Sequence, residues 1–274
     1  NLGVLPIIRS DGTALYPVSD LALASAKFEK YQLEESIYVV DIRQSLYFKQ
    51  LFKILELMGY KEKMTHLPYE FLTTKNGMMA SRTGNVITYK DLKDEALTRA
   101  TEEIRKRHED WNEEKITSVA FSLAISAMRF EMIKVSADKV IVFDMADALK
   151  FEGFTSSYLQ YTGARICSLF KKAENSDYGE ADESLLTEEK EFKLAIKLER
   201  FSEAVAKAGE DRDPSIIARY LFELAQDFND YYHAVNILKS AAPLKEARLL
   251  LIGSVKQVLE NGFNLIGVTY LTEM

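Results

Sequence analysis

Cysteine is almost absent from this chain of 274 residues, which has a single thiol at Cys167. One cysteine can build neither a disulfide framework nor a cysteine-based zinc site, so we expect a reducing compartment and predict a cytoplasmic location. Histidine is also scarce. His66, His108 and His233 are scattered, without metal-ligand spacing or an obvious nucleophile partner, so we predict no metal site and assign all three to structural or surface roles.

Long hydrophobic runs are missing as well. No apolar stretch approaches the roughly 18 to 20 residues that span a bilayer, and the opening NLGVLPIIRS lacks the basic start and apolar block of a signal peptide. We therefore expect no membrane partner. The first residue is Asn1 rather than methionine, so we expect the chain to be a processed or truncated piece of a longer protein.

An excess of basic residues is absent too, because the formal net charge is −7 at pH 7. This charge argues against a protein that holds nucleic acid through bulk electrostatics, although it leaves a local basic face open. Hydrophobic residues make up 47% of the chain, which is typical of a globular protein. At roughly 100 to 200 residues per domain, the length predicts two domains.

What is present first is an alternation of strand and helix patterns. TALY precedes the helical LALASAKFEKY, and SIYVVDI precedes a segment in which Leu51, Ile54 and Leu55 recur at helical spacing. Two such units predict a parallel sheet with helices on its faces. From about Lys90 the pattern is almost wholly helical, so we predict an α/β portion over residues 1–117 and an all-α bundle over residues 118–274.

Polar residues follow both predicted strands, where ligands bind in parallel sheets. Tyr16 is the last residue of TALY, Asp20 follows it four residues later, and Gln44 follows SIYVVDI. A carboxylate beside a phenol and an amide suits a planar cation, because a guanidinium pairs with a carboxylate through two parallel hydrogen bonds. The alternative is that Asp20 only caps a helix and that Tyr16 is a half-buried aromatic residue.

The segment 77–88, GMMASRTGNVIT, combines small residues with one cation. Gly77 and Gly84 give flexibility, Ser81 gives a hydroxyl, and Arg82 could neutralise charge during phosphoryl or nucleotidyl transfer. The flanking HLPYEFLT and NVITY also fit an ordinary surface hairpin. Composition alone leaves both interpretations open.

The helical part carries aromatic and guanidinium groups that could stack on unpaired bases. Packing in a helical core, with polar tips in solvent, is the alternative role for such residues. The candidates are Tyr158, Tyr161, Arg165, Asn229, Tyr231, Tyr232 and Arg248.

Taken together and in order, several long stretches resemble the C-terminal half of class I arginyl-tRNA synthetases, and they span nearly the whole chain. The stretches are DGTALYPVSDLALA, IYVVDIRQSLYFKQLFKILELMGY, MASRTGNVITYKDLKDEAL, IVFDMADALKFEGFTSSYLQYTGARI, FNDYYHAV and ARLLLIGSVKQVLENGFNLIGVTYLTEM.

The resemblance implies the second half of a Rossmann-like catalytic domain followed by an anticodon-binding bundle. The parent protein would activate L-arginine with ATP, accompanied by Mg²⁺, and transfer it to tRNA(Arg), working as a monomer. By the same resemblance, Tyr16, Asp20 and Gln44 form the arginine pocket. The resemblance also implies a loop that contacts ATP, made of Met79, Ala80, Ser81, Arg82 and Gly84, in which Ser81 and Arg82 are catalytic. It further implies an anticodon site made of Tyr158, Arg165, Asn229, Tyr232 and Met274.

The chain also departs from the family pattern. Met78 and Ser81 stand where the loop has two lysines, Ala80 stands where it has a serine, and Tyr47 replaces a histidine. The His-Ile-Gly-His signature of class I enzymes is absent from the sequence. We therefore expect a fragment that is inactive alone. The alternatives are a non-catalytic module that binds tRNA or a protein, and a relative whose α/β part is only a scaffold.

Overall fold

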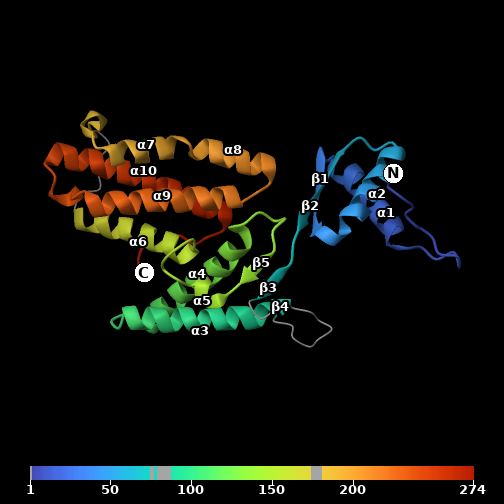
Figure 1. Cartoon of the computed structure of the whole chain (residues 1–274), viewed down its shortest axis with the longest axis horizontal. Coiled ribbons are helices and arrows are strands. Elements are labelled where there is room, and N and C mark those ends of the chain that lie inside the picture. Colours follow the sequence, from blue (N-terminus) through green and yellow to red (C-terminus); the bar gives the residue numbers. More distant parts are fainter. Residues whose placement is uncertain (1, 75–76, 79–87, 174–180) are drawn as a thin grey trace. The chain divides into compact units, whose positions relative to one another are not determined.

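The computed structural model describes residues 2–74, 77–78, 88–173 and 181–274 (Figure 1). The chain forms two compact units, one made of residues 1–71 and 137–140 and the other of residues 72–136 and 141–274. The predicted boundary between residues 117 and 118 falls inside a long helix of the second unit.

The first unit contains a small parallel sheet covered by helices on one face. Strand β1 pairs with β2 in parallel register, from Glu35 opposite Lys63 to Asp41 opposite Tyr69. Tyr38 and Val40 pack against a core of helix side chains, whereas Ile37 and Val39 on the opposite face are 46% and 61% exposed. The elements are α1 (Tyr16–Tyr31), β1 (Glu35–Asp41), the 3-10 turn η1 (Ile42–Gln44), α2 (Ser45–Leu57) and β2 (Lys63–Tyr69).

The helical periodicity explains the core of this unit. Ala24 and Phe28 of α1 meet Phe48, Leu51 and Leu55 of α2, all of them buried. These residues recur three, four or seven positions apart, so they share one face of each helix.

The predicted strand TALY is wrong. Ala14 forms only an isolated bridge with Ile8, and α1 already begins at Tyr16. Pro17 lies in the first turn of α1, where its fixed φ angle favours a helix and its missing N–H leaves no bond unmade.

The second unit contains three short strands among its described residues, two at its start and one after α4 (Glu113–Ile133). Strand β3 (Leu72–Thr74) pairs in parallel with β5 (Ile141–Phe143) and antiparallel with β4 (Gly77–Met78). The antiparallel pair has the geometry that a hairpin requires. Residues 79–87 of the predicted loop lie outside the described part of the chain, and α3 starts after them with a capping box between Thr88 and Asp91.

Helices make up the rest of this unit, and Figure 1 shows α7, α9 and α10 side by side. One core cluster is centred on α3, α4 and α5, and a larger one joins α6 to α10. The helices are α3 (Tyr89–Arg107), α4 (Glu113–Ile133), α5 (Met145–Ala148), α6 (Ser156–Ala173), α7 (Glu189–Glu199), α8 (Phe201–Asp211), α9 (Ser215–Ala234) and α10 (Ala242–Ile266), with 3-10 turns at Glu183–Leu185 and Ile237–Lys239.

Contrary to the expectation that no apolar stretch approaches a bilayer-spanning length, one described helix, α4, is long and apolar enough to cross a membrane by length and composition. Ten of its residues are buried, and the eight apolar ones, including Leu123 and Phe130, contribute to the two cores. A core helix of a globular domain has these same properties.

Residues 267–274, which we call the C-terminal strap, follow α10 and contact both α4 and α6. The strap starts at Gly267 with a φ angle of 67°, which favours glycine. Ser126 of α4 accepts a hydrogen bond of 3.1 Å from the Thr269 N–H, and Gln160 of α6 donates one of 2.8 Å to the Thr269 carbonyl. Leu271 is buried in the α3–α4 core.

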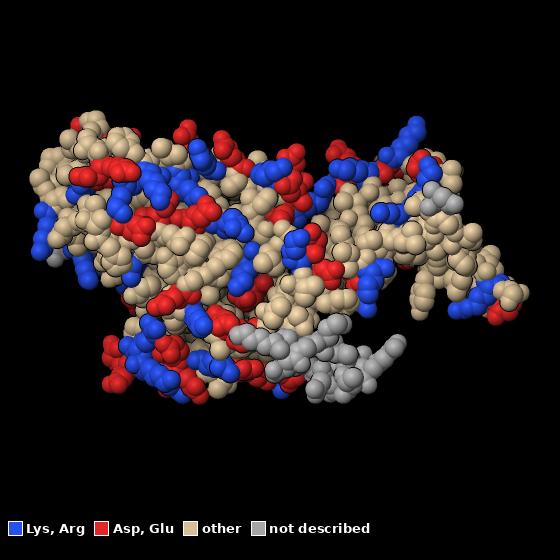
Figure 2. Space-filling view, viewed as in Figure 1, with Lys and Arg blue, Asp and Glu red and all other residues tan. Residues whose placement is uncertain are grey.

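Basic and acidic side chains are interspersed over the helical unit on the face drawn in Figure 2. On this face, a binding site for a charged ligand must therefore come from local groups rather than from a field of one sign.

Candidate functional site

A cavity of about 470 Å³ in the first unit brings together the three residues predicted to bind a guanidinium. Tyr16 and Asp20 line it from the first two turns of α1, and Gln44 lines it from the end of η1, immediately before α2. The four-residue spacing in α1 places Tyr16 and Asp20 on one face. The Tyr16 side chain is 86% exposed, so this wall of the cavity is open to solvent.

Tyr47 is a fourth polar residue of this cavity, and its hydroxyl donates a hydrogen bond to Oδ2 of Asp20. Burial, followed by the Asp20 carboxylate, raises the pKa of Tyr47, so this phenol remains a neutral donor at physiological pH. In the sequence, Tyr47 stands out only as a departure from a family pattern. Its contact with Asp20 links residues 27 positions apart, a distance that no local pattern reveals.

Aromatic packing supports this wall of the cavity. The Tyr47 ring meets Phe48 edge-on at 5.4 Å, and Phe48 stacks on His66 with centroids 4.7 Å apart. His66 Nε2 also lies 3.0 Å from the Val40 carbonyl oxygen. His66 therefore has structural partners on β1 and α2.

The predicted ATP-contacting loop cannot be placed in this way. Met79, Ala80, Ser81, Arg82 and Gly84 all lie in residues 79–87, outside the described part of the chain. Their proposed roles rest on the sequence alone.

A second cavity, of about 620 Å³, lies in the helical unit and contains three of the predicted anticodon-binding residues. Arg165 comes from α6, Tyr232 from α9 and Met274 from the C-terminal strap. The Arg165 guanidinium lies 5.1 Å from the Tyr232 ring centroid and 4.9 Å from that of Tyr161. Aromatic faces beside a guanidinium form a surface on which a nucleobase can stack.

Tyr158 and Asn229 do not line this cavity, although they were predicted alongside its residues. Asn229 is 8% exposed and donates hydrogen bonds to the Tyr158 hydroxyl at 2.9 Å and to Thr162 Oγ1 at 3.0 Å. Its carbonyl oxygen accepts a hydrogen bond from Arg165. Asn229 thus orients Arg165, and Tyr158 orients Asn229.

Tyr231 and Arg248 also have structural roles. Tyr231 is fully buried and Arg248 is 8% exposed. Both contact the buried carboxylate of Glu191, Arg248 Nε at 2.7 Å and the Tyr231 hydroxyl at 3.2 Å. Neither side chain is available to an RNA base, so the interpretation as core residues holds for this pair.

The second cavity also has residues that sequence analysis missed. Trp111 stacks on His108 with centroids 3.9 Å apart, and the Lys115 ammonium lies 3.9 Å from the Trp111 ring centroid. Lys171 and Glu273 complete this rim. The signal in the sequence was the only Trp of the chain, which lies in the HEDW connection between the charged α3 and the apolar α4.

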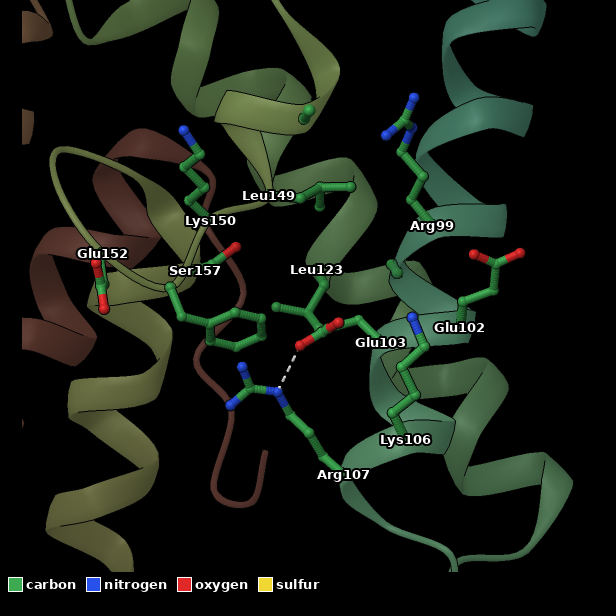
Figure 3. Close-up of a pocket in the computed structure, with 13 residues that line it drawn as sticks. Arg99, Glu102, Glu103, Lys106, Arg107, Leu123, Leu149, Lys150, Glu152 and Ser157 are labelled. Atoms are coloured by element: carbon green, nitrogen blue, oxygen red, sulfur yellow. Dashed lines mark hydrogen bonds and ion pairs between the residues drawn. The ribbon is translucent and has the colours of Figure 1, made fainter.

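A third cavity, of about 530 Å³, lies among α3, α4, α5 and α6 (Figure 3). Its charged residues have both signs, and Arg107 pairs with Glu103 at 2.8 Å while covering the Phe151 ring at 4.0 Å. The buried Ser157 hydroxyl has no hydrogen-bond partner among the described residues. The mixed charge favours no single class of ligand.

Comparisons with known proteins agree along the chain. Residues 1–145 match the family model for the catalytic domain of class I tRNA synthetases (R), and residues 159–274 match the DALR anticodon binding domain. An arginine–tRNA ligase of Bdellovibrio bacteriovorus is 37% identical over 271 residues, which cover 97% of this chain and 47% of that relative. An arginine–tRNA ligase of Treponema pallidum is 35% identical over 277 residues, which cover 98% of this chain and 47% of that relative.

Solved structures give the same result. The arginyl-tRNA synthetase of Thermus thermophilus superposes with a TM-score of 0.87 at 29% identity, covering 98% of this chain and 50% of that structure. The chain thus spans about half the length of the relatives it matches.

Proposed function

Because the chain belongs to the class I arginyl-tRNA synthetase family, we propose that it is the C-terminal half of an arginine–tRNA ligase that activates L-arginine with ATP and esterifies it to tRNA(Arg). In this proposal residues 1–117 complete the catalytic domain and residues 118–274 bind the anticodon. The whole protein acts in the cytoplasm as a monomer, and ATP enters as its Mg²⁺ complex.

The cavity at Asp20 is the observation that carries this proposal. Its carboxylate accepts two parallel hydrogen bonds from the arginine guanidinium, while Tyr16 and Gln44 provide an aromatic face and an amide beside it. A neutral analogue of arginine cannot form these charge-assisted hydrogen bonds with Asp20. Catalysis needs no covalent bond to the enzyme, since positioning and electrostatic stabilisation suffice for amino-acid activation.

The segment 79–87 completes the reaction centre in this proposal. Arg82 offsets charge that develops on the ATP phosphates, Ser81 supplies a hydroxyl, and Met79, Ala80 and Gly84 form the rest of the loop. These roles are supported by the composition of the segment, in which Arg82 is the only cation among mostly small residues between β4 and α3.

The helical unit recognises tRNA through the cavity around Tyr232. An unpaired anticodon base stacks on Tyr232 beside Arg165, and Met274 adds an apolar contact. Tyr158 and Asn229 contribute by holding the guanidinium in place.

A non-catalytic binding module is the second candidate, favoured by Met78, Ala80 and Ser81 in a loop that carries lysines and a serine in the family. A hybrid protein separates the two. The N-terminal half of the Bdellovibrio relative is joined to this chain, and arginine-dependent pyrophosphate exchange is measured with and without Asp20→Asn.

Exchange that appears in the hybrid and disappears with Asp20→Asn is the expected result, because the substitution removes the charge that selects the guanidinium. The chain alone should show none. A folded hybrid without exchange would leave the binding module as the function.

A further inference from the structure

The C-terminal strap carries an acid that joins two helices at the rim of the anticodon cavity. Glu273 accepts hydrogen bonds from the ammonium groups of Lys115 and Lys171. Lys115 lies in the first turn of α4 and Lys171 in the last turns of α6. All three residues line the cavity that contains Tyr232 and Arg165.

The strap backbone is anchored immediately before this acid. Leu271 is buried, and the Tyr270 hydroxyl donates a hydrogen bond of 3.1 Å to the Gly163 carbonyl. These contacts fix where Glu273 leaves the backbone. The two lysines therefore meet at one defined point on the rim.

The ion pairs themselves are exposed and exchangeable. The side chains of Lys115, Lys171 and Glu273 retain 38%, 61% and 36% of their accessible surface. Ion pairs this exposed add little to the stability of the fold, since water screens them. Another anion can take the carboxylate's place at little cost.

Electrostatics determine which kind of anion fits. Glu273 carries a full negative charge between the two ammonium groups at neutral pH, and their hydrogen bonds and charges favour this ionised form by lowering its pKa to about 2. The Trp111 ring holds the Lys115 ammonium at the rim. A phosphodiester has the same single charge and two acceptor oxygens, and it lies next to a base in every nucleotide.

We propose that Lys115 and Lys171 form a binding site for one phosphate group of an RNA backbone, and that Glu273 fills this site as an internal anion until RNA displaces it. The inference rests on the proposed anticodon function and extends it. Because the Glu273 carboxylate competes with the phosphate for the two lysines, it lowers the affinity of the chain for any RNA. Selection then depends more on the bases that reach Tyr232.

The test measures binding of a hairpin RNA with the stem and loop of an arginine tRNA anticodon arm to the 274-residue chain. Glu273→Gln should raise the affinity about three- to tenfold at low salt, because the lysines are released from their exposed pairs. The slope of log affinity against log salt should steepen by about one, as for one added phosphate contact. Glu223→Gln is the control, since it removes the same single charge, together with one lysine pair instead of two, without touching the cavity.

The second part of the test uses a chain from which both lysines have been removed. In the Lys115→Gln/Lys171→Gln chain, adding Glu273→Gln should give no gain in affinity. A gain that persists there, or a Glu273→Gln chain with wild-type thermal midpoint and unchanged or weaker RNA binding, overturns the phosphate site. A loss of affinity would make Glu273 a residue that only positions the strap.

Tyr232→Ala separates this inference from the proposed function. Binding that responds to Glu273→Gln but not to Tyr232→Ala leaves the phosphate site standing without base stacking. Binding that responds only to Tyr232→Ala rejects the phosphate site, and a chain that binds no hairpin at any salt concentration rejects both.

Discussion

At the scale of single residues, the contact between Tyr47 and Asp20 gives a direct test of the arginine pocket. Tyr47→Phe removes the hydroxyl that donates to the carboxylate while keeping the ring against Phe48. A hydrogen bond to a charged group contributes about 1.5 to 3 kcal/mol, so we expect the KM for arginine in the hybrid ligase to rise at least roughly tenfold. Steady-state pyrophosphate exchange measures this change.

Tyr38→Phe is the matched control for that experiment. The buried Tyr38 hydroxyl has no hydrogen-bond partner among the described residues, so its removal should leave the KM for arginine unchanged. Equal effects of the two substitutions would contradict a specific role for the Tyr47 hydroxyl.

Tyr232 allows a second residue-scale prediction, this time for the anticodon cavity. Tyr232→Ala should weaken hairpin binding by about 1 to 3 kcal/mol if a base stacks on its ring. The measurement is a titration by fluorescence anisotropy at fixed salt. Tyr31→Ala, at an exposed position of the first unit, should change nothing, and a Tyr232→Ala chain with wild-type affinity would reject the stacking role.

At the scale of elements, the packing of the C-terminal strap on α6 depends on a glycine. A Cβ at Gly163 would lie 2.9 Å from ring atoms of Tyr270, too close for ordinary contact. Gly163→Ala should therefore destabilise the helical unit by about 1 to 3 kcal/mol through overpacking, measured by urea unfolding.

Gly209→Ala on α8 is the comparison for that substitution. Nothing lies within 4 Å of a Cβ at Gly209, so alanine there should stabilise the unit by about 0.5 to 1 kcal/mol through its higher helix propensity. Destabilisation of similar size at both sites would show that close packing is not the cause.

The sequence reveals elements better than it reveals contacts between them. The periodicity of Leu51, Ile54 and Leu55 identifies α2, and the apolar run before Asp41 identifies β1. TALY misleads because a short alternating segment has no length to distinguish a strand from the start of a helix. Tyr16, Asp20 and Gln44 line one cavity, as predicted, but the rule that polar residues after parallel strands converge applies only to Gln44, since Tyr16 and Asp20 lie in α1 and follow no strand among the described residues.

The residues around Tyr232 were harder to predict for a physical reason. Lys115 and Glu273 are 158 positions apart, and the hydrogen bond between Tyr270 and Gly163 spans 107. Such contacts depend on how α4, α6 and the strap pack, which periodicity within one segment does not encode. The roles of Arg82 and Ser81 stay predictions, since their loop lies outside the described residues.

At the scale of the whole molecule, the two units differ greatly in core size. The first unit has five buried apolar residues in its core and leaves Ile37 and Val39 exposed on a parallel sheet, a fold that is ordinarily covered on both faces. The second unit has two larger clusters. Less buried apolar surface means less stability, so we expect the first unit to unfold at lower denaturant.

Trp111, the only tryptophan, lies in the second unit and makes this expectation measurable. Its fluorescence should report one transition, whereas far-UV circular dichroism should show an earlier one as well, because two units of unequal stability violate two-state behaviour. Leu51→Ala, at a fully buried position of the first unit, should remove about 2 to 5 kcal/mol from the early transition and leave the Trp111 transition in place. If both probes instead follow one curve that Leu51→Ala shifts as a whole, the units unfold together, and the small sheet gains its stability from the helical unit.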